Sequence, residues 1–162
     1  MAAQLIWLNR HFQDQSMRLG FSFFMAFTVL AMGAQAQQSE RFDRFELHRS
    51  VVYTTFLSPE IAAEYGIARG DFKAILTLSV RDVDAGETAG RPMLIKGETW
   101  DLIRGDTLEF KEIRENNATY YIADFEFIDR EWRFFEFDFR PEGSDQTYHY
   151  KFKTQLWKQS ER

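Results

Sequence analysis

The sequence contains no cysteine and only three histidines and three prolines. Without cysteine, a disulfide framework, a thiol nucleophile and a cysteine-ligated zinc site are all excluded. An excess of positive charge is also missing, since 20 lysines and arginines face 25 acidic residues and the formal net charge is −5. Sequence-independent nucleic-acid binding needs a basic surface, so no nucleic-acid partner is expected.

Motifs that identify common enzyme classes are also absent. The sequence has no G-x-S-x-G nucleophile elbow, no glycine-rich phosphate loop and no H-E-x-x-H metal motif. We therefore predict no catalytic residue, no metal site and no cofactor.

The first 36 residues have the pattern of an export signal. Arg18 precedes an uncharged, apolar stretch from Leu19 to Met32, and small residues lead up to a cleavage site between Ala36 and Gln37. The stretch is shorter than the ~20 residues of a spanning helix. We expect residues 1–36 to be an N-terminal extension plus signal peptide helix, with a periplasmic domain over 37–162. The alternative is that the leader is retained as a membrane anchor. If the leader is cleaved, the chain contacts the membrane only through the signal segment, before cleavage.

From Phe45 onward, apolar and polar residues alternate with the period of β-strands. This alternation predicts seven strands, at about residues 45–53, 73–81, 92–102, 107–113, 119–128, 132–140 and 148–157. One short helix is expected after the first strand, because Ser58 can cap it, Pro59 fits its first turn and Gly66 can end it. A helix of about two turns is not stable in isolation, so we expect it to pack on the sheet.

Two hairpins can be registered from their own alternation. A turn at Asn116-Asn117 pairs Phe110 with Ala123 and, further along, Leu108 with Phe125. Asparagine tolerates the positive φ that tight turns require. Pairing apolar with apolar residues keeps both faces of the hairpin consistent.

A second hairpin is centred on Gly143-Ser144 and pairs Phe137 with Tyr150. By contrast, a tight turn at Asp129-Arg130 would mix the two faces, so the chain is expected to contain a bulge or to cross between sheets there. The expected fold is an all-β, antiparallel, immunoglobulin-like β-sandwich, with a closed barrel as the alternative.

Two acids and two histidines are the remaining candidates for chemistry. Glu136 and Asp138 lie on one strand face, about 7 Å apart, a spacing that suits glycoside hydrolysis. Lysines on the facing strand would hold both pKa values down, however. His48 and His149 fall on polar strand faces. We interpret all four as solvated surface residues.

Large aromatic residues also occur on polar strand faces. Trp132 and Phe134 lie on the charged face of their strand, and Trp157 follows near the end of the chain. Exposed aromatic clusters can mark a surface for a partner or a sugar. We expect the short helix or a loop to cover them, because sheet ends need protection.

Several separated segments resemble a known family. The run Thr55-Phe56-Leu57-Ser58-Pro59-Glu60-Ile61-Ala62-Ala63-Glu64-Tyr65-Gly66-Ile67-Ala68-Arg69, together with Asp101-Leu102, Leu108-Glu109-Phe110 and residues 118–125, is similar to the DUF4426 family of small exported proteins of gammaproteobacteria. The family has no assigned activity, so the resemblance implies a β-rich exported protein without known catalytic residues. This chain departs from the pattern at Arg49, where an aromatic residue is usual, and at Gly70, where serine is common.

The predicted function is an exported, non-catalytic binding or interaction module for an envelope protein or another envelope component. Four residues have side chains that neither helix formation nor the alternation of the strands requires, and we predict them as contact residues: Tyr65, Arg69, Tyr120 and Trp132. Two alternatives remain open. One is a hydrolase that uses the carboxylates or histidines, and the other is a carrier of an apolar ligand in an internal cavity.

Overall fold

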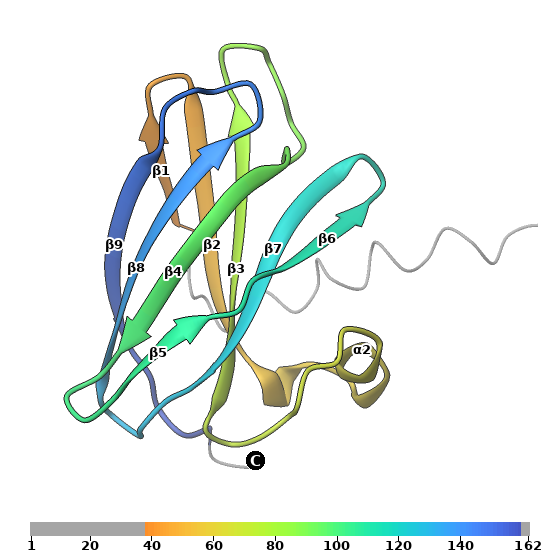
Figure 1. Cartoon of the computed structure of the whole chain (residues 1–162). Helices are drawn as coiled ribbons and strands as arrows, with labels where there is room; N and C mark the ends of the chain where they lie inside the picture. Colours follow the sequence, from red (N-terminus) through yellow and green to blue (C-terminus); the bar gives the residue numbers. More distant parts are fainter. Residues whose placement is uncertain (1–37, 160–162) are drawn as a thin grey trace, which may run out of the picture. The chain divides into compact units, whose positions relative to one another are not determined.

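The computed structural model describes residues 38–159, which form two antiparallel sheets (Figure 1). The five-stranded sheet contains, in spatial order, β1 (Gln38–Phe42), β2 (Phe45–Tyr53), β3 (Lys73–Asp82), β7 (Ala118–Glu126) and β6 (Lys111–Glu115). The four-stranded sheet contains β5 (Gly105–Leu108), β4 (Met93–Trp100), β8 (Trp132–Pro141) and β9 (Tyr148–Gln155). The expected antiparallel β-sandwich is confirmed.

Two predictions from the N-terminus cannot be compared with this structure. The leader, residues 1–36, and the cleavage site Ala36–Gln37 lie outside the described residues. Within residues 38–159, no helix has both the length and the apolar character needed to cross a membrane.

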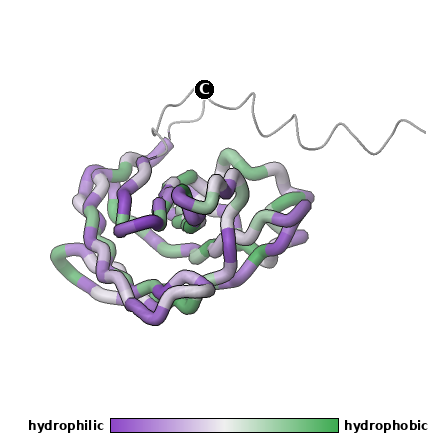
Figure 2. Tube along the Cα trace, turned by 90° about the horizontal axis from the view of Figure 1, so that it is seen from above, coloured by the Kyte–Doolittle hydropathy of each residue, from purple (hydrophilic) through white to green (hydrophobic). Residues whose placement is uncertain are grey.

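The core lies between the two sheets and is rich in phenylalanine. Hydrophobic and hydrophilic residues alternate along the strands that enclose it (Figure 2). Phe125 and Phe135 make an edge-to-face contact across the sheets, with ring centroids 4.9 Å apart. Gly97 faces this core, and a Cβ atom there would lie 2.5 Å from the Cβ of Phe137. The missing side chain therefore makes room for the phenylalanine on the next strand.

Both predicted hairpin turns are confirmed. Asn116 and Asn117 have φ values of 46° and 69°, and β6 pairs with β7 around them. In the second hairpin Phe137 is paired with Tyr150. The second register places Phe135, Phe137 and Phe139 on the core face, whereas in the first hairpin Ile113 and Tyr120 pair on the outer face, in the small apolar cluster at the helix.

The expected strand over residues 107–113 is wrong, because the chain changes sheet in the middle of it. β5 pairs with β4, so Leu108 lies opposite Gly97 rather than Phe125, while β6 pairs with β7 in the other sheet. Phe110 lies between the two strands and contacts the ring of Phe137, with centroids 6.5 Å apart. This split, together with β1, gives nine strands in the described part of the chain.

The chain also crosses between the sheets at residues 127–131, as one of the two sequence-based alternatives predicted. β7 belongs to the five-stranded sheet and β8 to the four-stranded sheet. Arg130 adopts a φ of 65° in this connection. A tight hairpin is therefore replaced by a sheet-to-sheet crossing.

The helical segment consists of η1 (Thr54–Phe56) and α2 (Pro59–Glu64). The Ser58 hydroxyl accepts a hydrogen bond from the Ile61 amide (3.3 Å), and Gly66 ends the helix with a φ of 63°. The helix packs on the outer face of the five-stranded sheet, in a small apolar cluster of Leu57, Ala62, Ile67, Ile75 and Ile122. It therefore does not cover Trp132 or Trp157, and the expectation that it would is wrong.

An arginine closes one side of the sandwich. Arg49 points inward from β2, and its guanidinium lies 4.0 Å from the ring centroid of Phe152 on β9. Its Nε donates to the Tyr150 hydroxyl (3.0 Å). Arg49 thus covers the rings of Tyr150 and Phe152 at the gap between the sheets.

Candidate functional site

The outer face of the four-stranded sheet carries an aromatic row. Trp100 on β4 lies opposite Phe134 on β8, which in turn lies opposite Lys153 on β9. The Trp100 and Phe134 rings are stacked, with centroids 5.7 Å apart and an interplanar angle of 9°. The strand register therefore fixes two nearly parallel rings beside a lysine.

One flank of this row has no side chain. Gly105 on β5 lies directly opposite Trp100, and a Cβ atom added there would make an ordinary van der Waals contact with the Trp100 Cβ at 3.5 Å. The glycine therefore places no side chain on this flank of the tryptophan.

Two lysines border the aromatic row. Lys151 pairs with Glu136 at 2.8 Å, whereas Lys153 forms no ion pair with a described residue and lies 4.7 Å from the ring centroid of Trp132. A depression of about 240 Å³ lies between these groups and is lined by Trp100, Phe134, Phe135, Lys151, Phe152 and Lys153. We call these six residues and Trp132 the aromatic–lysine platform. It joins an apolar floor to ammonium groups at the rim.

The predicted carboxylates lie further along the same face. His149 Nδ1 is 2.8 Å from an Asp138 oxygen, and its Nε2 is 3.3 Å from Glu136. The hydrogen bond with His149 lowers the pKa of Asp138, and Lys96 acts in the same direction. His48 is on the other sheet. Asp138 is thus held ionised on an exposed sheet face, and no group of three or more potential ligands within residues 38–159 could hold a metal ion.

The structure brings two of the predicted contact residues together. Tyr65, at the end of α2, donates a hydrogen bond to Glu115 on β6, and Tyr120 packs beside them over the small apolar cluster. The bond to Glu115 raises the pKa of Tyr65, while burial and the same carboxylate raise the pKa of Tyr120. Both tyrosines are thus neutral groups that fasten the helix to β6 and β7.

The other two predicted contact residues lie elsewhere. Arg69 donates to the backbone oxygens of Thr54 (3.4 Å) and Thr55 (3.2 Å), so it supports η1. Trp132 is 43% exposed and belongs to the platform. Trp100 is not among the residues predicted from the sequence, although the run Leu94, Lys96, Glu98 and Trp100 on one strand face could have identified it.

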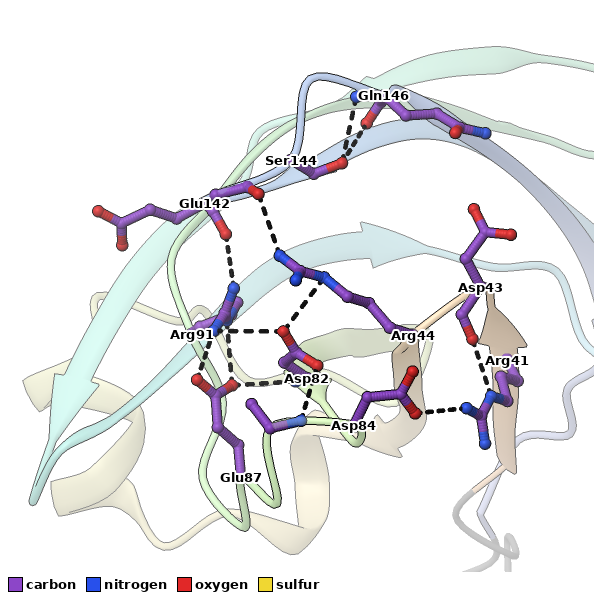
Figure 3. A network of polar contacts seen from close by, with 12 residues as sticks. Arg41, Asp43, Arg44, Asp82, Asp84, Glu87, Arg91, Glu142, Ser144 and Gln146 are labelled. Carbon is purple, nitrogen blue, oxygen red and sulfur yellow. Dashed lines mark hydrogen bonds and ion pairs between the residues drawn. The ribbon is translucent and has the colours of Figure 1, made fainter.

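A second, larger depression of about 660 Å³ lies at the opposite end of the sandwich from α2. It is lined by the loop 86–92, by Asn117 and Thr119, and by Glu142 and Gly143. A network of charged residues lies beside it, and Figure 3 shows how these side chains converge.

The network is built on a buried aspartate. Arg44 Nε approaches Asp82 at 3.2 Å, and Arg91 reaches the same carboxylate at 3.8 Å. Arg91 also binds both oxygens of Glu87 and donates to the Glu142 backbone oxygen (2.7 Å). The Arg91 guanidinium, which lines the depression, is thus already engaged by protein oxygens. This network ties the loop ends together, and the platform is the better candidate for ligand binding.

The comparisons with known proteins agree with the fold. A DUF4426 family protein from Pseudomonas aeruginosa PAO1 has a similar structure, with a TM-score of 0.66 and 22% identity, over 78% of this chain and 98% of that one. A copper-bound variant of FetP from uropathogenic Escherichia coli strain F11 has a TM-score of 0.55 and 10% identity, over 74% and 94% of the two chains.

A second structure of FetP, produced in the periplasm of E. coli BL21(DE3), has a TM-score of 0.53 and 10% identity, over 76% and 95% of the two chains. At these identities the likeness concerns the fold alone. None of the curated proteins matches the chain. The family model described as domain of unknown function (DUF4426) matches residues 39–159, and the chain belongs to this family.

Proposed function

We propose that this chain is an exported, periplasmic, non-catalytic binding protein whose ligand is an acidic saccharide of the cell envelope. The observation that carries the proposal is the stacked pair Trp100–Phe134 beside the rim lysines of an apolar depression. Ligand sites typically combine an apolar surface with a few well-placed polar groups.

The chemistry of the platform suits a sugar ring with a carboxylate. The C–H face of a pyranose packs on an aromatic ring, and Gly105 places no side chain on its flank of Trp100. Lys153 has no carboxylate partner among residues 38–159, so its ammonium group is available to the acidic group of a ligand. The apolar floor and the ammonium group thus recognise two different parts of one molecule.

Binding is favoured over hydrolysis by the state of the acids. An acid catalyst needs a carboxyl group that stays protonated near neutral pH. The pKa of Asp138 is shifted downward instead, by His149 and Lys96. Glu136 is occupied by Lys151 at 2.8 Å. These interactions suit a surface that holds ligands, because Asp138 lacks the raised pKa of an acid catalyst.

Export is supported by the leader pattern of residues 1–36 and the absence of cysteine. The production of the structural neighbour FetP in the periplasm is compatible with this location. An acidic saccharide is a ligand that an envelope protein can meet there.

Isothermal titration calorimetry tests the proposal. The full chain is expressed in a gammaproteobacterial host, purified from the periplasmic fraction and titrated with a muropeptide (an acidic disaccharide peptide) and with neutral chitobiose. We expect the muropeptide to bind at least about tenfold more tightly, since a charge-assisted hydrogen bond contributes about 1.5–3 kcal/mol.

Variants localise the binding. Trp100→Ala and Lys153→Gln should each weaken muropeptide binding about tenfold or more, whereas Leu94→Ala, an exposed apolar residue at the far end of β4, should bind normally. Equal binding by Trp100→Ala and the unaltered chain, or no binding of any acidic saccharide, would contradict the proposal.

A further inference from the structure

Exposed apolar side chains gather at one end of the sandwich. Seven large hydrophobic residues within 38–159 are exposed, and five of them lie at the end that contains η1, the β4–β5 turn and the C-terminal residues (Figure 1): Phe56, Phe72, Leu102, Ile103 and Trp157. Trp132 lies beside this end, and Leu94 is the exception. We call the five residues the apolar end. Such a concentration on a soluble domain indicates an interaction site.

The most exposed members are held in a rigid turn. Leu102 and Ile103 are 82% and 81% exposed. One oxygen of Asp101 accepts hydrogen bonds from the amides of Ile103 (2.8 Å) and Arg104 (2.9 Å), and its other oxygen accepts from Arg133 (2.6 Å). A buried ion pair therefore fixes the turn that presents two aliphatic side chains to solvent.

Aromatic rings surround a second part of the apolar end. Phe56 contacts Tyr53 edge to face, with centroids 5.7 Å apart, and Phe72 contacts Phe127 at 6.1 Å. The Trp157 amide donates to the Tyr53 hydroxyl (3.2 Å), which brings the indole to the same end. The exposed rings thus rest on a buried aromatic base and are fixed in place.

Charge at this end is neutralised locally, although the chain as a whole carries −5. Five basic side chains at this end pair with five acids: Lys73 and Arg104 with Glu126, Arg130 with Asp129, Lys158 with Asp71, and Arg133 with Asp101 and Asp106. Lys158 also lies 5.4 Å from the ring centroid of Phe72. The apolar end therefore offers neither a basic field for anionic lipids nor an acidic field that repels a membrane.

We propose that the apolar end docks the protein on the surface of a zwitterionic lipid bilayer. Leu102 and Ile103 form a protruding tip that can enter the acyl boundary, while Trp157 is the type of side chain that lies at the headgroup level. Neutral local charge matches a neutral headgroup layer, so burial of apolar area supplies the attraction. This inference is independent of the saccharide platform.

Two further observations favour a bilayer over a protein partner. Neither the depression beside the platform nor the one at the loop 86–92 is lined by any of the five residues, and Leu102 and Ile103 project from a hydrogen-bonded turn. The apolar stretch of the leader also ends at Met32, and only residues 33–37 separate it from β1. The domain thus emerges close to a membrane during export.

Vesicle co-sedimentation tests this inference. The exported protein, purified from the periplasm and shown by mass spectrometry to lack the apolar leader, is mixed with vesicles of phosphatidylcholine and phosphatidylethanolamine. We expect binding that persists at high salt, because ion pairing contributes little. The double variant Leu102→Ser/Ile103→Ser should lower the partition coefficient by at least about tenfold, since two aliphatic groups no longer leave water. Leu94→Ser, exposed on the sheet face, is the matched control and should bind like the unaltered chain.

A second readout uses tryptophan fluorescence. When vesicles with brominated lipids are added, the fluorescence of the unaltered chain should be quenched more than that of Trp157→Phe, because quenching requires contact with the acyl chains. The inference is overturned if the unaltered chain fails to sediment with neutral vesicles, if the double variant binds equally well, or if binding needs anionic lipid and is released by salt. Capture of a protein partner through Leu102 in the absence of vesicle binding would also overturn it.

Discussion

Arg133 and Asp101 form an ion pair at the edge of the core, with Nη1 and Oδ2 2.6 Å apart and each side chain only 1% exposed. Burial alone raises the pKa of Asp101, but hydrogen bonds from the Arg104 and Ile103 amides and the charge of Arg133 hold it below its usual value. Arg133 also donates to Thr99 (2.9 Å). A buried pair is tolerated when its remaining donors are satisfied in this way.

Removing the arginine should therefore be costly. Arg133→Met leaves the Asp101 carboxylate buried without its cation, and we expect a loss of about 3–5 kcal/mol in the free energy of unfolding. Urea unfolding followed by circular dichroism measures this loss. Asp101→Asn should cost less than Asp101→Ala, because asparagine can still accept the amide hydrogen bonds of Ile103 and Arg104. Equal losses for the two Asp101 variants would show that the turn does not depend on these bonds.

Arg49 closes the gap between β2 and β9 by stacking on Phe152. Arg49→Ala should lower the free energy of unfolding by about 1 kcal/mol, because the cation–π contact and the covering of the rings are both lost. Arg49→Tyr should retain most of the stability, since another ring can cover Phe152. Thermal unfolding of both variants checks this. If Arg49→Ala and Arg49→Tyr lower the free energy of unfolding equally, covering of the Phe152 ring is not the reason that Arg49 stabilises the fold.

Gly90 is required by close packing. A Cβ atom at this position would lie 2.1 Å from the Ser79 hydroxyl and 2.2 Å from the Thr119 backbone oxygen. We expect Gly90→Ala to destabilise the fold by about 1–3 kcal/mol through overpacking. Gly70→Ser is the matched control, because a Cβ there meets only the flexible Lys73 side chain at 3.4 Å. Denaturant midpoints that shift equally for both variants would refute this explanation.

Acid should weaken the contact between β2 and β3. Hydrogen bonds from Arg81 to Glu46, at 2.9 and 2.6 Å, lower the pKa of Glu46 to about 2. A carboxylate with a lowered pKa in the folded state stabilises above its ordinary pKa, near 4.5, and loses this contribution as the pH falls toward 2.

The measurement is the free energy of unfolding between pH 6 and pH 2. Glu46→Gln should be about 1 kcal/mol less stable than the unaltered chain at pH 6, and this difference should shrink as the pH falls. Glu40→Gln on β1 is the control with an exposed glutamate. A constant difference between the Glu46 variant and the unaltered chain would rule out this ion pair as its source.

The elements defined by local chemistry could be predicted from the sequence. Two asparagines with positive φ, the Ser58 cap and the Gly66 terminator each act within a few residues. The hairpin registers follow from alternation, because a one-residue slip would turn core side chains outward. Local signals therefore identified strands, turns and the helix.

The sheet change at Glu109–Phe110 could not be found in this way. Residues 107–113 keep an alternating pattern through the crossing, and only the core ring of Phe137 determines where Phe110 packs. The same holds for the candidate site. Trp100, Phe134 and Lys153 come from three strands, and they meet only because β8 lies between β4 and β9. Tyr65 and Arg69 stay predicted contact residues, and in the fold they also bind Glu115 and the backbone oxygens of Thr54 and Thr55, partners that the sequence alone does not identify.

The central claim is that the aromatic–lysine platform is the recognition surface. The indole N–H signals in ¹⁵N-correlated NMR spectra test it most directly, because Trp100 and Trp132 belong to the platform whereas Trp157 lies at the apolar end. On titration with a muropeptide, we predict that the Trp100 and Trp132 signals shift together and that the Trp157 signal stays in place. Unchanged Trp100 and Trp132 signals, with shifts confined to the loop 86–92 and Asn117, would contradict the account.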